Sequence, residues 1–158
     1  LGLGLARFYI YTGSFIGSRD LARLNLATEV VPVEEFGEAL NRALANNSKQ
    51  DKVDIQTLDT DTQALAKWLS EAPSTTLLDG SAEEPEPLKA MKTLKKISHK
   101  APLAIGMVEE LTTVADTGEL DDGLAAELSK LQAIFGSSDA LEGLSALLER
   151  RRPTYQGM

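Results

Sequence analysis

The chain has 158 residues, 42% of them hydrophobic and 5% aromatic, and its 24 acidic and 16 basic residues give a net charge of −8. This size suits one compact domain or one lobe of a larger protein, and the few aromatic residues favour helices over a β-sandwich. The absence of cysteine excludes disulfides, thiolate metal sites and a cysteine nucleophile. The acidic balance argues against nucleic acid as a partner. No apolar run approaches the ~20 residues of a membrane span, so we expect a cytoplasmic protein without a membrane partner.

The first part of the chain has mainly helical patterns. Apolar residues predict a short helix over 3–11, which Gly13 ends, because glycine is favoured just past a helix. About two helical turns follow Ser18, a plausible cap. Residues 28–32 are β-rich and end in proline, which indicates a very short strand or an extended link. A further helix is predicted over 34–44. Large apolar residues four apart lie on one face of this helix: Phe36, Leu40 and Leu44.

The middle of the chain is less regular. Residues 46–61 are polar and rich in turn formers, which indicates a surface loop, and a helical pattern returns over 61–69. The acidic, proline-rich stretch 81–87 reads as a mobile hinge. These features divide the chain into helices with an extended link (1–45), a loop-rich inserted segment with one helix (46–87) and a C-terminal helical lobe (88–158).

The C-terminal lobe shows four successive helical patterns. Pro102 stands where a first-turn proline opens a helix, and Asp139 with Glu142 predicts a capping box at the start of the last helix. Burying one leucine contributes about 1.5–3 kcal/mol, so packing of these helices should hold the lobe together. The residues expected to face inward are Leu88, Met91, Leu94 and Ile97; Ile105, Val108, Leu111 and Val114; Leu120, Leu124, Leu128, Leu131 and Phe135; and Leu141, Leu144 and Leu148.

Three consecutive arginines, at 150–152, follow the last helical pattern. Guanidinium groups bind phosphate through charge-assisted hydrogen bonds. Cations at this place also complement the negative end of the helix dipole, and composition alone favours that simpler role.

Other candidate features carry less functional signal. His99, near Pro102, is expected to be exposed or to cap a helix. Gly143, inside the last helix, favours close packing over a ligand. The adjacent acids at 109–110 and 121–122 point in different directions from a helix and are expected on its polar face. The opening Leu-Gly-Leu-Gly-Leu lacks the preceding strand and the spacing of a dinucleotide-binding loop.

Three blocks of the sequence resemble the enoyl-CoA hydratase/isomerase (crotonase) family. The tail DALEGLSALLERRRPTY (139–155) is similar to that family's closing pattern D-x-x-E-G-x-x-A-(apolar)-x-E-(K/R)-R-(K/R)-P-x-(aromatic). Thr12-Gly13 with residues 19–32 resembles the block L-T-G … A-x-x-x-G-L-V-x-x-V-V-P, with Asn25 in place of glycine and Tyr11 in place of leucine. Residues 97–104 resemble the S-P-x-A opening of a later helix. The blocks occur in family order and cover both ends of the chain.

The resemblance implies a mainly α chain that forms the C-terminal helical lobe of a crotonase-like α/β-spiral fold, with the β-spiral core absent from this chain. In the family that core supplies the oxyanion hole and the catalytic carboxylates, ahead of the L-T-G block where this chain begins. We therefore expect no catalytic residue, no metal ligand and no tightly bound cofactor here. The family's C-terminal helices cover the active site, form trimer contacts and reach the coenzyme A (CoA) part of the substrate. The expected partners are an acyl-CoA substrate and further copies of the chain in a homo-oligomer.

The same resemblance carries three residues over to CoA binding. The family's basic residue near the CoA phosphates falls on Arg150. Its aromatic residue near the adenine falls on Leu131, a departure from the pattern, and Phe135, one turn later, is the candidate substitute.

Several functions fit the resemblance. The tail, with Ile134 and Phe135 leading into it, is most similar to the hydratase part of archaeal proteins that join 3-hydroxyacyl-CoA dehydrogenase to enoyl-CoA hydratase. This predicts hydration of 2-enoyl-CoA in fatty acid metabolism by the whole protein, with the 158-residue chain inactive alone. The long segment 46–94 instead resembles that of 3-hydroxyisobutyryl-CoA hydrolases. A non-catalytic helical interaction module, in which the arginines only cap a helix, is the alternative from another class.

Overall fold

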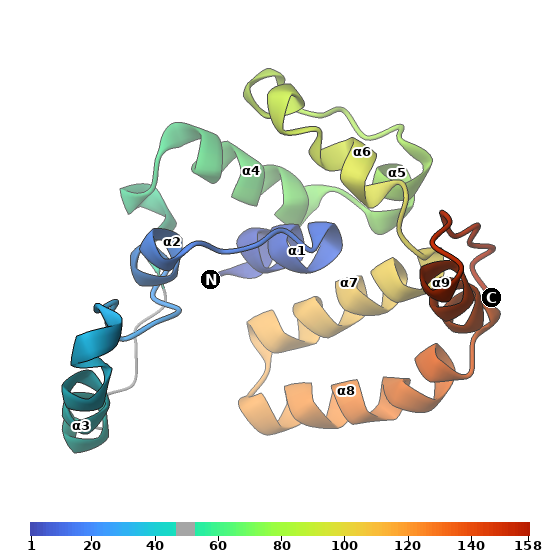
Figure 1. Ribbon diagram of the computed structural model, residues 1–158. Helices are drawn as coiled ribbons and strands as arrows, with labels where there is room; N and C mark the ends of the chain where they lie inside the picture. Colours follow the sequence, from blue (N-terminus) through green and yellow to red (C-terminus); the bar gives the residue numbers. More distant parts are fainter. Residues whose placement is uncertain (47–52) are drawn as a thin grey trace.

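The computed structural model describes residues 1–46 and 53–158, apart from the side chains at positions 87, 90 and 91. This described part contains helices and no strand (Figure 1), as its composition predicted. The α-helices are α1 (Leu3–Thr12), α2 (Ser18–Arg23), α3 (Phe36–Asn46), α4 (Thr60–Glu71), α5 (Ser74–Asp79), α6 (Thr93–Ile97), α7 (Pro102–Thr117), α8 (Leu120–Phe135) and α9 (Ser138–Leu148). Short 3₁₀ segments are η1 (Val33–Glu35), η2 (Ile55–Thr57) and η3 (Glu86–Met91). None of the described helices is long and apolar enough to span a membrane.

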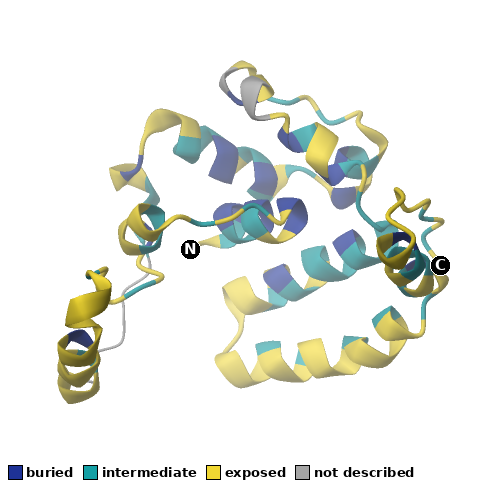
Figure 2. Cartoon of the chain, viewed as in Figure 1, coloured by how far each residue is buried: buried dark blue, intermediate teal, exposed yellow. Residues whose placement is uncertain are grey.

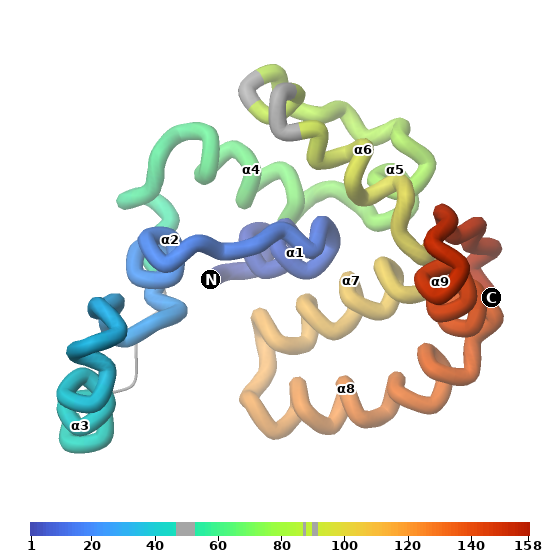
Figure 3. The backbone as a smooth tube through the Cα atoms, viewed as in Figure 1, coloured from blue at the N-terminus to red at the C-terminus, as the bar shows by residue number. Residues whose placement is uncertain are grey.

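The core forms around α1, which packs against both α4 and α7 (Figures 1 and 3). Figure 2 shows buried positions concentrated on α1, α4 and α5. The largest fully buried apolar side chains come from these helices and from residues 24, 88 and 97: Tyr11, Leu5, Leu24, Leu69, Leu77, Leu88 and Ile97. At about 1.5–3 kcal/mol for each apolar side chain, this cluster dominates the packing energy of the chain.

A glycine determines how closely α1 and α4 approach. A Cβ atom built on Gly4 would lie 1.7 Å from the carbonyl oxygen of Ala66, which no side chain tolerates. Gly2, just before the helix, has a φ of 74°, a left-handed conformation that glycine adopts without strain. The two glycines of the opening segment therefore serve the start of α1 and its crossing with α4.

A buried cation links the three central helices. Arg7 is only 4% exposed. Its guanidinium donates to Thr112 Oγ1 at 3.0 Å and to the Leu69 carbonyl at 3.3 Å, and further to backbone or hydroxyl oxygens of Ser70, Glu109 and Thr113. A buried charge is tolerated only when its donors are satisfied, so these bonds make Arg7 a connector of α1, α4 and α7.

Several local predictions are confirmed and others are refined. The first helix ends at Thr12, and Gly13 adopts the left-handed conformation with φ of 65°. Pro102 is the first residue of α7. Residues 28–32 form an irregular link and no strand. The helix expected over 61–69 is α4, whose cap is the Asp59 carboxylate accepting from the Thr62 amide at 2.9 Å.

The predicted loop 46–61 differs from the structure in its described part. Residues 47–52 lie outside the described residues, but Leu58 is buried in the core next to η2. The helix α5 was not predicted, because six residues are too few for a helical period. The continuous helix expected from 88 to 97 is interrupted at Lys92, which has a φ of 54° and separates η3 from α6.

Three apolar helix faces lie at the surface, on α3, α8 and α9 (Figure 2), which corrects the expectation that those of α8 and α9 face inward. Phe135 is 77% exposed and Leu148 84% exposed. The other exposed members of these faces are Phe36, Leu40 and Leu44; Leu120, Leu124, Leu128 and Leu131; and Leu141 and Leu144. An amphipathic period shows that a helix has an apolar face, but the partner surface need not belong to the same chain.

Candidate functional site

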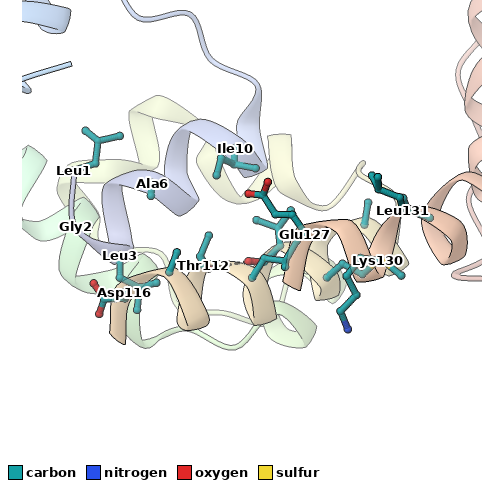
Figure 4. A pocket seen from close by; sticks show the side chains of 16 residues that line it. Leu1, Gly2, Leu3, Ala6, Ile10, Thr112, Asp116, Glu127, Lys130 and Leu131 are labelled. Carbon is teal, nitrogen blue, oxygen red and sulfur yellow. Dashed lines mark hydrogen bonds between the residues drawn. The ribbon is translucent and has the colours of Figure 1, made fainter. Parts of the chain in front are cut away.

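An apolar groove lies between α1, α7 and α8, with a volume of about 590 Å³. Leu3, Ala6 and Ile10 recur at helical spacing along one side of α1 and line it (Figure 4). Leu131 contributes from α8, and Met107 contributes from α7. The groove therefore offers an apolar surface that includes one of the residues predicted to contact the adenine.

Charged side chains stand on the α8 side of this groove. Lys130 and Glu127 line it, and the Lys130 ammonium forms an ion pair with Glu110 of α7. Figure 4 shows the Lys130 amine pointing away from α1. This exposed pair connects α7 to α8, and exposed ion pairs of this kind stabilise a protein by less than about 1 kcal/mol.

Two polar side chains of α7, those of Thr112 in the groove lining and of Glu109, make structural hydrogen bonds. Thr112 Oγ1 accepts from Arg7 and donates to the Val108 carbonyl at 2.7 Å. The Glu109 carboxylate accepts from the backbone amide of Ser74 at 3.1 Å and from its hydroxyl at 2.5 Å. Glu109 is half-buried within α7, which corrects its expected place on a polar face. Its carboxylate thus caps the start of α5.

Two further candidate features of the sequence are possible metal ligands and the acid pair at 121–122. Within residues 1–46 and 53–158 no group of three histidine or acidic side chains is arranged to hold a metal ion. Asp122 forms a capping box with Glu119 at the start of α8, which is a structural role.

The C-terminal end of α9 places Arg150 in an unusual conformation. The Arg151 amide donates to the Ala146 carbonyl at 3.0 Å and the Arg150 amide donates to the Leu147 carbonyl at 3.2 Å, the pair of bonds of a Schellman motif. Arg150 has a φ of 56° in the position that glycine usually occupies. Its side chain is exposed and forms no ion pair with the described residues.

Arg151 has a different role from its neighbours. Its guanidinium binds both carboxylate oxygens of Glu142, at 2.6 and 2.8 Å, and also Glu149 at 2.5 Å. The Arg151 guanidinium, together with the Thr154 amide, lowers the pKa of Glu142 to about 2. Arg151 therefore holds the tail through its ion pairs. Arg150 and Arg152 lack ion-pair partners among the described residues.

Asp139 fixes the last residues of the chain, which corrects the predicted capping box. Ser137 is the cap of α9, accepting from the Ala140 amide at 3.1 Å. Asp139 is 3% exposed, and its carboxylate accepts from the backbone amides of Gln156 at 2.7 Å and Gly157 at 2.8 Å. Nothing local in the sequence indicates these contacts, because they join residues 17 and 18 positions apart.

The structure separates the residues predicted to contact CoA. Leu131 lines the apolar groove, whereas Phe135 does not line it and Arg150 follows the far end of α9. Their roles in binding stay predictions. Two other expectations are confirmed: His99 is exposed, and Gly143 packs against Tyr155, whose hydroxyl would lie 3.2 Å from an added Cβ atom.

The chain matches a family profile over most of its length, and it matches individual relatives over shorter segments. The profile of the enoyl-CoA hydratase/isomerase family matches residues 2–157. A probable mitochondrial enoyl-CoA hydratase 2 of Arabidopsis thaliana is 35% identical over 69 residues, which are 44% of this chain and 23% of the relative. Methylmalonyl-CoA decarboxylase of Escherichia coli is 38% identical over 65 residues, 39% of this chain and 24% of the relative. A probable enoyl-CoA hydratase of Bacillus subtilis is 30% identical over 79 residues, 49% of this chain and 31% of the relative.

The matched segments thus span about a quarter to a third of the length of these relatives. No solved structure matches the chain significantly. The family match, by contrast, includes every helix described above, from the groove-lining α1 to the tail held by Asp139. This chain belongs to the enoyl-CoA hydratase/isomerase family.

Proposed function

We propose that this chain is the C-terminal helical lobe of a crotonase-like acyl-CoA enzyme, in which it contacts the CoA part of the substrate and packs against other subunits. The observation that carries the proposal is the family match over residues 2–157. The names of the relatives, two hydratases and a decarboxylase, each specify a CoA compound. The whole enzyme would act in fatty acid metabolism, in the cytoplasm, by hydrating 2-enoyl-CoA.

In that reaction water adds across the double bond and an enolate forms at the thioester carbonyl. Backbone amides of an oxyanion hole stabilise the enolate most strongly in the transition state, and the proposal assigns them to the β-spiral core. This lobe would supply binding energy away from the reacting atoms. Such remote contacts raise the rate by orienting the substrate.

Arg150 is the proposed contact to the CoA phosphates. Its exposure and its lack of an ion pair with the described residues leave the guanidinium available for bidentate hydrogen bonds to phosphate oxygens. Leu131, in the apolar groove, and the exposed Phe135 would provide the surface beside the adenine. The exposed leucine faces of α8 and α9 support the proposed oligomer, because large apolar patches mark contact surfaces.

Calorimetry with CoA on the complete enzyme tests the Arg150 contact. Arg150→Glu removes a charge-assisted bond and adds repulsion, so we expect at least about 10-fold weaker binding. Arg19→Glu is the matched control, since Arg19 is also exposed and lies on α2 at the other end of the molecule (Figure 1). Equal CoA affinity in both variants and the parent protein would favour the non-catalytic interaction module.

Activity assays distinguish the enzyme alternatives. The proposal predicts loss of enoyl absorbance when the complete enzyme meets crotonyl-CoA, and no such loss with the 158-residue chain alone. A 3-hydroxyisobutyryl-CoA hydrolase would instead release free CoA thiol. That second candidate is supported by the length of the middle segment, 46–94.

The proposed likeness to dehydrogenase–hydratase fusions has its own test. If the complete protein contains the dehydrogenase part, it will reduce NAD when given 3-hydroxybutyryl-CoA. Hydration without NAD reduction would support the hydratase assignment and exclude a dehydrogenase part.

A further inference from the structure

Two segments far apart in the sequence meet at the start of α7. Asp139 holds the amides of Gln156 and Gly157, and a Cβ atom built on Gly157 would lie 3.5 Å from the Pro102 side chain. The C-terminal tail is thereby fixed beside the residues that lead into α7, an arrangement that Figure 1 shows on the α9 side of the molecule.

A pocket of about 550 Å³ lies between these two segments. His99 and Lys100 line it from the segment before α7, and Arg152 and Tyr155 line it from the tail. Its other lining residues are Leu78, Ser98, Pro102 and Pro153, so no carboxylate lines the pocket. In a chain of net charge −8, this is a local concentration of positive charge.

The two cations in this pocket are not neutralised by ion pairs within the described residues. Arg151, the neighbour of Arg152, instead forms ion pairs with Glu142 and Glu149. The Lys100 ammonium lies close to the C-terminal end of α1, since a Cβ atom built on Gly13 would be 3.8 Å from Nζ. Arg152 therefore contributes the guanidinium that is free for a ligand, and Lys100 adds a second positive charge.

The start of α7 borders the pocket through Pro102, its first residue, so the positive end of the helix dipole lies nearby. Proline has no amide hydrogen, and the next residues, Leu103 and Ala104, do not line the pocket. The donors are therefore side chains, and Arg152 with Lys100 favours an anion with several acceptor oxygens.

We propose that this pocket binds a phosphoryl group, as a phosphate monoester or a diphosphate. Arg152 would donate two hydrogen bonds to its oxygens, with Lys100 and His99 as further donors. Tyr155 and Pro153 would border any organic part of the ligand. The site uses no residue of the proposed Arg150 contact, so it does not rest on the proposed function.

Titration of the 158-residue chain with inorganic pyrophosphate, ADP and CoA tests this site. We expect pyrophosphate and ADP to bind at submillimolar concentration, and Arg152→Glu to weaken both at least about 10-fold. Lys100→Glu should weaken them by a smaller factor, and Arg19→Glu, with the same charge change elsewhere, by less than about 3-fold. Circular dichroism of each variant would establish that the chain still folds.

The ligands separate the possible sources of the phosphoryl group. Equal affinity for pyrophosphate and ADP means that the pocket holds the anion alone, and tighter CoA binding that depends on Arg152 assigns it to the CoA phosphates. Arg150→Glu, a charge change outside the lining of the pocket, should weaken pyrophosphate binding by a smaller factor than Arg152→Glu does. No measurable binding of pyrophosphate or ADP, or binding that Arg152→Glu leaves intact, overturns the inference. The proposed function is tested separately, by the Arg150 and crotonyl-CoA experiments on the complete enzyme.

Discussion

The left-handed conformation of Arg150 leads to a quantitative prediction. A residue with a Cβ atom is destabilised there by about 1–2 kcal/mol, and glycine recovers this energy but loses about 0.5–1 kcal/mol through its greater freedom in the unfolded state. Replacing arginine also removes a cation from a helix C-terminus. The clean comparison is therefore between Arg150→Gly and Arg150→Ala, which share that loss and differ in the Cβ atom.

We predict that Arg150→Gly is more stable than Arg150→Ala by about 0.5–1 kcal/mol. For a chain of this length, that corresponds to a melting temperature higher by about 2–4 °C per kcal/mol. Urea unfolding followed by circular dichroism measures the difference. The same two substitutions at Arg152, which does not have a positive φ, are the control, and there alanine should equal or exceed glycine in stability.

Alanine at position 150 as stable as glycine would refute the reasoning, because it would mean that the Schellman end of α9 is not held in solution. The expected result would show a strained position that carries arginine although glycine fits it better. Backbone strain of this kind is found mainly where the side chain has a function. Arg150→Gly should then bind CoA more weakly than the parent in the complete enzyme while it melts no lower than Arg150→Ala.

Three further predictions concern the core and the tail. Gly4→Ala should destabilise the chain by about 3 kcal/mol or more, because its Cβ atom would overlap the Ala66 carbonyl; a smaller loss in urea unfolding would mean that α1 and α4 separate easily. Arg7→Ala should cost about 3 kcal/mol or more by leaving buried oxygens without donors, and a melting temperature within 2 °C of the parent would contradict this. The folded-state pKa of Glu142 is about 2, below its ordinary 4.5, so its contribution is present above pH 4.5 and is lost as pH falls toward 2. Glu142→Gln should remove that part of the acid destabilisation measured by urea unfolding between pH 5 and 3, and identical pH profiles of variant and parent would exclude it.

Helices whose signals are local were predictable from the sequence. α1 ends at a glycine and α7 begins at a proline, and both residues act within one turn of the backbone they affect. The tail was only partly predictable. Asp139 was assigned to a capping box because Glu142 follows it by three residues. Its actual bonds to Gln156 and Gly157 depend on how the chain folds back.

Burial was the least predictable property. The leucine pattern of α8 is as regular as that of a core helix, yet Leu128 and Phe135 are exposed, whereas the less regular α4 buries Leu65 and Leu69. Periodicity identifies an apolar face but not its partner. The candidate site shows the same limit, since equal side chains at 150, 151 and 152 differ in conformation and in ion pairing.

The bonds of Arg7 have a consequence for the order in which the protein acquires its structure during synthesis. They reach Leu69, 62 residues later, and Thr112, 105 residues later. Ribosomes add about 5–20 residues per second, so the first helix waits about 5 to 20 s for its last partner to be made. Over that time its apolar surface is open to aggregation and to chaperones. α1 is therefore synthesised well before the partner that completes its enclosure, and a slowly translated stretch before α7 would prolong its exposure.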